Sequence, residues 1–150
     1  MCSKTAEARR FLQQPKRLNR LIQNKLIEQQ QMRDIALSVT AQYGGERVQS
    51  SGNNQKMADA LGRFVDMESE IDALVDKLIN AKRDVANVIE QLPLVEYELI
   101  HMVYVQGIDL LDVANDKDKT YSWATTIHGR ALKNIQTILE SKKTGKLQDI

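Results

Sequence analysis

Two long stretches of the chain carry apolar residues that recur every three or four positions. Stepping alternately by four and three, six of eight positions are apolar in the first stretch and nine of eleven in the second. The first series is Leu18, Ile22, Lys25, Gln29, Met32, Ala36, Val39 and Tyr43, and the second is Met57, Leu61, Phe64, Glu68, Ile71, Val75, Leu78, Lys82, Val85, Ile89 and Leu92. A narrow stripe of this kind is typical of a coiled-coil seam. The pattern therefore predicts two long helices, over 16–43 and 55–92.

The segment between these helices, YGGERVQSSGNNQK, is rich in Gly, Ser and Asn, which interrupt helices and allow the chain to reverse. We expect a loop at 43–55 and an antiparallel helical hairpin over 16–92. The same two arms could instead pair between chains, and the pattern leaves both arrangements open. Additional apolar residues widen the seam and favour a homo-oligomer, a dimer first: Leu21, Leu26, Ile35, Val65, Leu74, Ile79 and Val88.

The pattern changes after Pro93, where three shorter apolar sets follow one another. Pro93 suits the first turn of a helix, Gly107 suits the position just past its end, and Thr120 suits the cap of a third helix. The residues expected to face inward are Leu94, Tyr97, Ile100 or His101, Tyr104, Ile108, Leu111, Val113, Ala114, Ala124, Ile127, Ala131, Leu132, Ile135 and Leu139. This layout predicts a helix-turn-helix over 93–140, although a plain three-helix bundle has the same spacing.

Composition supports an all-α protein. The 150 residues include two prolines, seven glycines and few aromatic residues. We expect a basic N-terminal segment, 1–15, which Pro15 separates from the first long helix, and a polar tail, 141–150. A single cysteine and the lack of a long apolar run predict a cytoplasmic protein with no membrane association.

The net charge of +1 conceals an uneven distribution. Residues 1–56 hold ten basic and four acidic side chains, and residues 57–93 hold four and eight. Between 117 and 146 there are seven basic residues against two acidic ones. A basic stripe along one helix suits phosphate contacts, but it is also an ordinary solvated helix face. The same two interpretations apply to Arg9, Arg10, Lys16, Arg17 and Arg20.

No pattern in the chain indicates catalysis, a metal or a cofactor. His101 and His128 lie 27 positions apart, without Cys or carboxylate neighbours at metal-ligand spacing. Gly44 and Gly45 lack the strand-loop-helix context of a phosphate-binding loop. The residues Ser50, Ser51 and Cys2 have no nearby partner of the kind that activates a nucleophile. We therefore predict a protein that is not an enzyme and has neither catalytic nor metal-binding residues.

The sequence HGRAL at 128–132, preceded by DLLDVAN and a capped turn, resembles region 4 of sigma factors. From about Leu18 to Leu139, the chain resembles a family of small phage and prophage proteins grouped with late transcriptional regulators of the ArpU type. The segment ERVQSSGNNQKMADALGRFVDMESEID resembles the loop and second helix of that family. The resemblance implies a promoter-binding regulator in the cytoplasm of a bacterial host cell. Its expected partners are double-stranded DNA and also host RNA polymerase or a phage protein.

The resemblance places Val113 and Ala114 in the buried pair of the second helix. It further implies a set of DNA-contacting residues, of which the last two are better placed for phosphates than for bases: Lys119, Thr120, Tyr121, Ser122, Trp123, Thr125, Thr126, His128, Arg130 and Lys133. The chain departs from the family pattern at Lys117-Asp118, where an apolar residue and Gly are usual.

The expected reader positions also lack the Arg, Asn and Gln that suit bidentate base contacts. Two alternative functions follow. One is a small DNA-packaging, terminase-like subunit. The other is a protein-interaction module in which Tyr121 and Trp123 anchor a partner.

Overall fold

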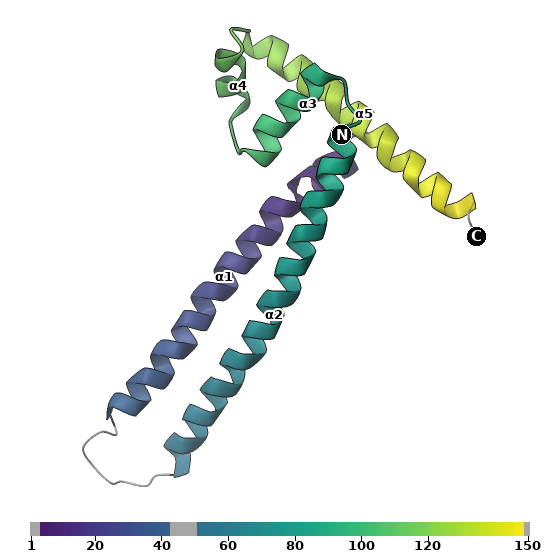
Figure 1. Cartoon of the computed structure of the whole chain (residues 1–150). Coiled ribbons are helices and arrows are strands. Elements are labelled where there is room, and N and C mark those ends of the chain that lie inside the picture. Colours follow the sequence, from purple (N-terminus) through teal and green to yellow (C-terminus); the bar gives the residue numbers. More distant parts are fainter. Residues whose placement is uncertain (1–3, 43–50, 149–150) are drawn as a thin grey trace. The chain divides into compact units, whose positions relative to one another are not determined.

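A computed structural model describes residues 4–42 and 51–148, with side chains for 4–38 and 54–146. The described part is all-α, as predicted, and contains no strand (Figure 1). Its elements are α1 (Ala6–Gln42), α2 (Ser51–Ile89), α3 (Leu94–Ile100), a π-helical turn η1 (His101–Val105), α4 (Leu110–Asp116) and α5 (Tyr121–Gln148). None of these helices has the length and apolar character needed to cross a membrane.

The chain divides into two compact units. Unit 1 contains Met1–Pro15 and Asn80–Ile150, and unit 2 contains Lys16–Ile79. Helices α1 and α2 each contribute residues to both units.

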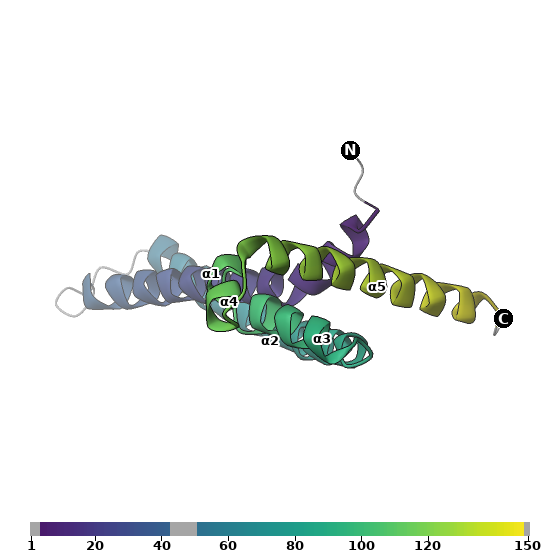
Figure 2. The same cartoon turned by 90° about the horizontal axis from the view of Figure 1, so that it is seen from above.

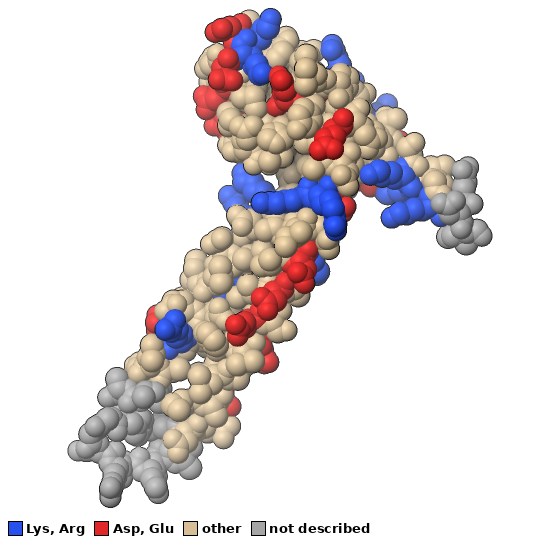
Figure 3. Space-filling view, in the orientation of Figure 1, with Lys and Arg blue, Asp and Glu red and all other residues tan. Residues whose placement is uncertain are grey.

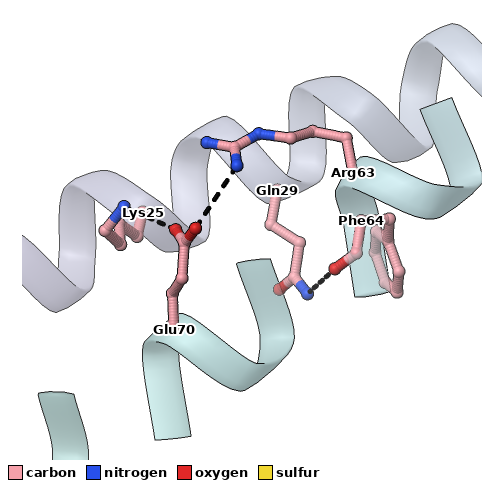
Figure 4. Close-up of polar contacts among 5 residues, drawn as sticks. All are labelled: Lys25, Gln29, Arg63, Phe64 and Glu70. Carbon is pink, nitrogen blue, oxygen red and sulfur yellow. Dashed lines mark hydrogen bonds and ion pairs between the residues drawn. The ribbon is translucent and has the colours of Figure 1, made fainter. Parts of the chain in front are cut away.

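In unit 2, the α1 and α2 segments run side by side in opposite directions. Lys25 Nζ lies 2.8 Å from Glu70 Oε2, and Gln29 Nε2 donates a hydrogen bond of 3.4 Å to the carbonyl oxygen of Phe64 (Figure 4). Later residues of α1 therefore lie beside earlier residues of α2, so the two helices are antiparallel. Arg63 Nη1 lies 3.3 Å from the other oxygen of Glu70, and the hydrogen bond from Lys25 lowers the pKa of that carboxyl group.

The seam of α1 follows the predicted series, whereas three positions of the predicted series of α2 are exposed: Leu61, Glu68 and Lys82. The α1 positions from Leu18 to Ala36 are buried or half-buried, and Val39 and Tyr43 lie outside the described side chains. The preceding residues Ala60, Met67 and Ala81 are buried in their place, while the predicted Val75 is half-buried and the predicted Ile89 is buried. The prediction was wrong at these three positions because it would place Glu68 and Lys82 in the seam, and burying an unpaired charge is costly.

The helix boundaries also differ from the sequence-based expectations. The first long helix does not start after Pro15, which lies inside α1, although the boundary between the two units follows this residue. Although proline removes one helical hydrogen bond, the inward face continues through it, with Leu12 buried on one side and Leu18 on the other. α2 begins at Ser51, inside the expected loop 43–55, while 43–50 lie outside the described residues. At the other end, α5 extends to Gln148, into the expected polar tail.

The core of unit 1 forms around α5, against which α3 and α4 pack (Figure 2). The predicted inward residues of this helix are confirmed, since five are buried and Leu139 packs partly buried against the core: Ala124, Ile127, Ala131, Leu132 and Ile135. Val113 and Ala114 are fully buried, as predicted. Leu94 and Leu111 are instead exposed, by 69% and 54%. The buried apolar residues are Leu99 and Ile100 in α3, and Val113 and Ala114 in α4. With these residues facing the core, Leu94 and Leu111 lie on the outer side of their helices.

Two side chains of α5 fix its neighbours through hydrogen bonds. Asn134 Nδ2 donates to both carboxyl oxygens of Glu96, at 3.1 and 2.9 Å, and Glu96 is only 3% exposed in the first turn of α3. Gln136 Oε1 accepts a 3.0 Å bond from the backbone N–H of Ala8, one of the first-turn groups of α1 that lack a partner within their own helix. Glu7 also pairs with Lys143, and that bond lowers the pKa of the Glu7 carboxyl group.

Candidate nucleic-acid interface

A tight turn joins α4 to α5. Asp118 has a φ of 54°, the left-handed conformation that usually favours glycine. The backbone N–H of Lys119 donates to the carbonyl of Ala114 at 2.8 Å, and that of Asp118 to Asn115 at 3.2 Å. These two bonds form a Schellman motif, which ends α4 and satisfies its last carbonyls. Asp118 therefore occupies the place of glycine with a side chain that tolerates this conformation.

The first turn of α5 is capped by Thr120. Its Oγ1 accepts the backbone N–H of Trp123 at 3.1 Å, which confirms the cap predicted from the sequence. One turn later, the hydroxyl groups of Thr125 and Thr126 both donate to the carbonyl of Ser122 at 2.9 Å. These hydroxyl oxygens therefore face outside partners mainly as acceptors.

One solvent-exposed face of α5 gathers half of the predicted contact residues. Ser122, Thr126 and Lys133 share it at spacings of four and seven, and Thr125 and Arg130 flank them, all exposed. Tyr121 lies at its start and is 55% exposed. We call the set Ser122, Thr125, Thr126, Arg130 and Lys133 the α5 outer face. It offers small polar groups near the helix start and cations one to two turns further on.

Of the five other predicted contact residues, two are half-buried, His128 and Trp123. His128 is half-buried and stacks on Tyr104, with ring centroids 5.7 Å apart and a hydrogen bond of 2.8 Å between His128 Nε2 and the Tyr104 hydroxyl group. Burial lowers the pKa of His128, and the nearby positive charge of Arg9 lowers it further, while burial raises the pKa of Tyr104. The sequence gives little sign of this pairing because Tyr104 is 24 positions away.

Trp123 is the second such residue, since it lines a small pocket of about 200 Å³ between α3, the α4–α5 turn and α5. The apolar lining comes from Val95, Leu99, Val113 and Trp123, and the charged lining from Glu98, Lys117 and Lys119. Lys117 Nζ lies 2.7 Å from Glu98 Oε2, and this bond raises the pKa of Lys117. Lys119 Nζ lies 6.0 Å from the centroid of the Trp123 ring, at the outer limit for a cation–π contact.

Charge is distributed unevenly around the interface. Helix α4 and its flanks carry exposed acidic residues and, before Lys117, no basic one: Asp109, Asp112, Asp116 and, in the turn, Asp118. Figure 3 shows acidic side chains over the α4 part of unit 1 and basic side chains over the distal half of α5. Negative charge is therefore concentrated around α4 and positive charge along α5.

Within residues 4–42 and 51–148, no group of three or more His, Cys, Asp or Glu side chains is placed to hold a metal ion. Comparisons of the chain with protein-family models, curated proteins and solved structures find no match.

Proposed function

We propose that unit 1 binds double-stranded DNA through the α5 outer face, as the helix-turn-helix of a phage-type transcriptional regulator. The observation that carries the proposal is the exposed polar and basic face of α5, immediately after a capped, tightly turned connection from α4. In a helix-turn-helix, the first turns of the second helix enter the major groove. The resemblance of HGRAL and its flanks to region 4 of sigma factors supports the same docking mode, with a promoter as target and RNA polymerase as second partner.

The residues of the α5 outer face have distinct roles in this proposal. Ser122, Thr125 and Thr126 meet base edges or sugars, with hydroxyl oxygens that accept hydrogen bonds from cytosine or adenine amino groups. Arg130 and Lys133 contact phosphates, which positions the helix without reading sequence. Because the acidic residues of α4 repel the phosphate backbone of DNA, the affinity for DNA depends on few phosphate contacts.

Unit 2 has the role of a dimerisation arm in this proposal. Several large apolar side chains remain exposed on its antiparallel helix pair: Leu21, Leu26, Ile35, Leu61 and Val65. Covering them with a second copy would remove that apolar surface from water. A dimer would also present two α5 helices to half-sites about one helical turn of DNA apart.

The test compares the parent with Arg130→Ala/Lys133→Ala and with a matched control, Lys142→Ala/Lys146→Ala, on the distal half of the same helix. Binding of fluorescent duplexes is measured by anisotropy over a range of salt concentrations. The first double variant should bind every duplex more weakly, and its slope of log K against log salt should shrink by about 1.8, at about 0.9 per lost phosphate contact. The control should retain most of the slope. Equal slopes in both variants would show that the α5 outer face is not where DNA binds.

A further inference from the structure

The pocket beside Trp123 has the size of a site for one side chain. Its volume of about 200 Å³ is below the range of roughly 300–1,000 Å³ that cofactor and drug-sized ligands need. Four of its lining residues are apolar, and Val95 at its rim is 50% exposed. Leu94, the preceding residue, is 69% exposed, so α3 begins with two exposed apolar side chains. When an apolar group enters this pocket, both the group and the apolar lining lose contact with water, which favours binding.

The charges at the rim select for an acidic partner. Glu98 already holds Lys117 at 2.7 Å, so these two charges compensate each other. In the described part of the chain, no carboxylate lies within ion-pair distance of the Lys119 ammonium group, which lies over the Trp123 ring instead. Among the residues that line the pocket, the charge left over is therefore positive, and its complement is a carboxylate next to the entering side chain.

We propose that this pocket is the docking site for a peptide segment of a partner protein, in which one aliphatic or aromatic side chain is flanked by Asp or Glu. The apolar side chain lies against Val95, Leu99 and Trp123, and the carboxylate pairs with Lys119. Trp123 supplies the kind of aromatic surface that dominates the binding energy of interfaces. The site differs from the α5 outer face, so unit 1 binds DNA and a protein through separate residues.

The probe is a random 12-residue peptide library displayed on phage and selected on the immobilised full-length chain. Trp123 is the only tryptophan of the chain, so its fluorescence reports binding of the selected peptides directly. Val95→Lys obstructs the pocket, and Val105→Lys is its matched control, because Val105 is 54% exposed outside the pocket. Lys119→Glu reverses the rim charge, with Lys146→Glu as control. Circular dichroism verifies that all four variants remain helical.

The selected peptides should share one apolar residue next to Asp or Glu. They should shift the emission of Trp123 and lose at least about tenfold in affinity in Val95→Lys and Lys119→Glu, equivalent to about 1.4 kcal/mol, but not in the controls. Selection of no peptide, or of basic peptides, would overturn the proposal, as would equal binding to Val95→Lys and Val105→Lys. If a DNA duplex displaces the peptide and shifts the same emission, the pocket belongs to the nucleic-acid interface instead. Duplex binding that is unchanged in Val95→Lys would support separate sites.

Discussion

The bond between Glu96 and Asn134 gives a sharp test of how α3 is held on α5. Glu96 is 3% exposed, and Asn134 Nδ2 donates to both of its oxygens. Asn134→Leu removes these bonds and leaves the buried carboxyl group of Glu96 without either of them. Losing hydrogen bonds to a charged group costs about 1.5–3 kcal/mol, and isolating a buried charge costs about 3–5. We expect unit 1 to lose about 2–4 kcal/mol of unfolding free energy, between these limits.

The double variant Glu96→Leu/Asn134→Leu removes both polar groups and should lie within about 1 kcal/mol of the parent. Unit 1 holds the only tryptophan, so urea unfolding followed by Trp123 fluorescence measures this unit. Asn87→Leu, at an exposed position of α2, is the control and should change stability by no more than about 0.5 kcal/mol. A double variant no more stable than Asn134→Leu alone would refute the argument, because the loss would then come from leucine and not from the stranded carboxyl group.

Three further predictions follow from the same structure. Asp118→Gly should stabilise unit 1 by about 0.5–1 kcal/mol in urea unfolding, because glycine adopts the left-handed conformation without steric cost; a loss of stability would contradict the turn geometry. Met67→Ala should cost unit 2 about 2–4 kcal/mol, and Leu61→Ala no more than about 0.5, as measured by circular dichroism; equal losses would contradict the seam. Because burial and Arg9 lower the pKa of His128, the unfolded chain binds its proton first as pH falls, so stability should be complete above the ordinary pKa of 6.5 and decrease below it. His128→Gln should flatten this decrease between pH 7.5 and 5.5, and an unchanged pH profile would contradict the buried, neutral ring.

The sequence was sufficient where one pattern excluded its alternatives. On α5, Ala124, Ile127 and Ala131 recur at helical spacing without a competing frame, and all are buried. Thr120 caps this helix, and Gly107 has a φ of 75°, as expected just past a helix end. These features depend on local backbone chemistry, which adjacent residues determine.

The sequence was insufficient to predict the buried face where two sets of apolar positions were possible. On α2, Leu61 and Ala60 both fit an apolar heptad, and only the pairing with α1 selects Ala60. Pro15 is locally a helix breaker, yet packing on both sides keeps α1 continuous.

The candidate interface was limited in a similar way. The resemblance grouped Trp123 and His128 with exposed residues of α5, but their environment depends on Tyr104 and α3, which are distant in sequence. What separates the α5 outer face from the pocket is therefore tertiary packing.

The most direct test of DNA binding by α5 is site-directed crosslinking. In a Cys2→Ser background, a photoreactive group is attached at Thr126→Cys, within the α5 outer face, or at Ser141→Cys. The second position is also exposed and lies 15 residues further along the same helix, at a distance of about 22 Å. We predict that a labelled duplex crosslinks at Thr126→Cys, in a manner that added salt suppresses, and only weakly at Ser141→Cys. Equal crosslinking at both positions, or none at Thr126→Cys under conditions where the duplex is bound, would contradict the proposed interface.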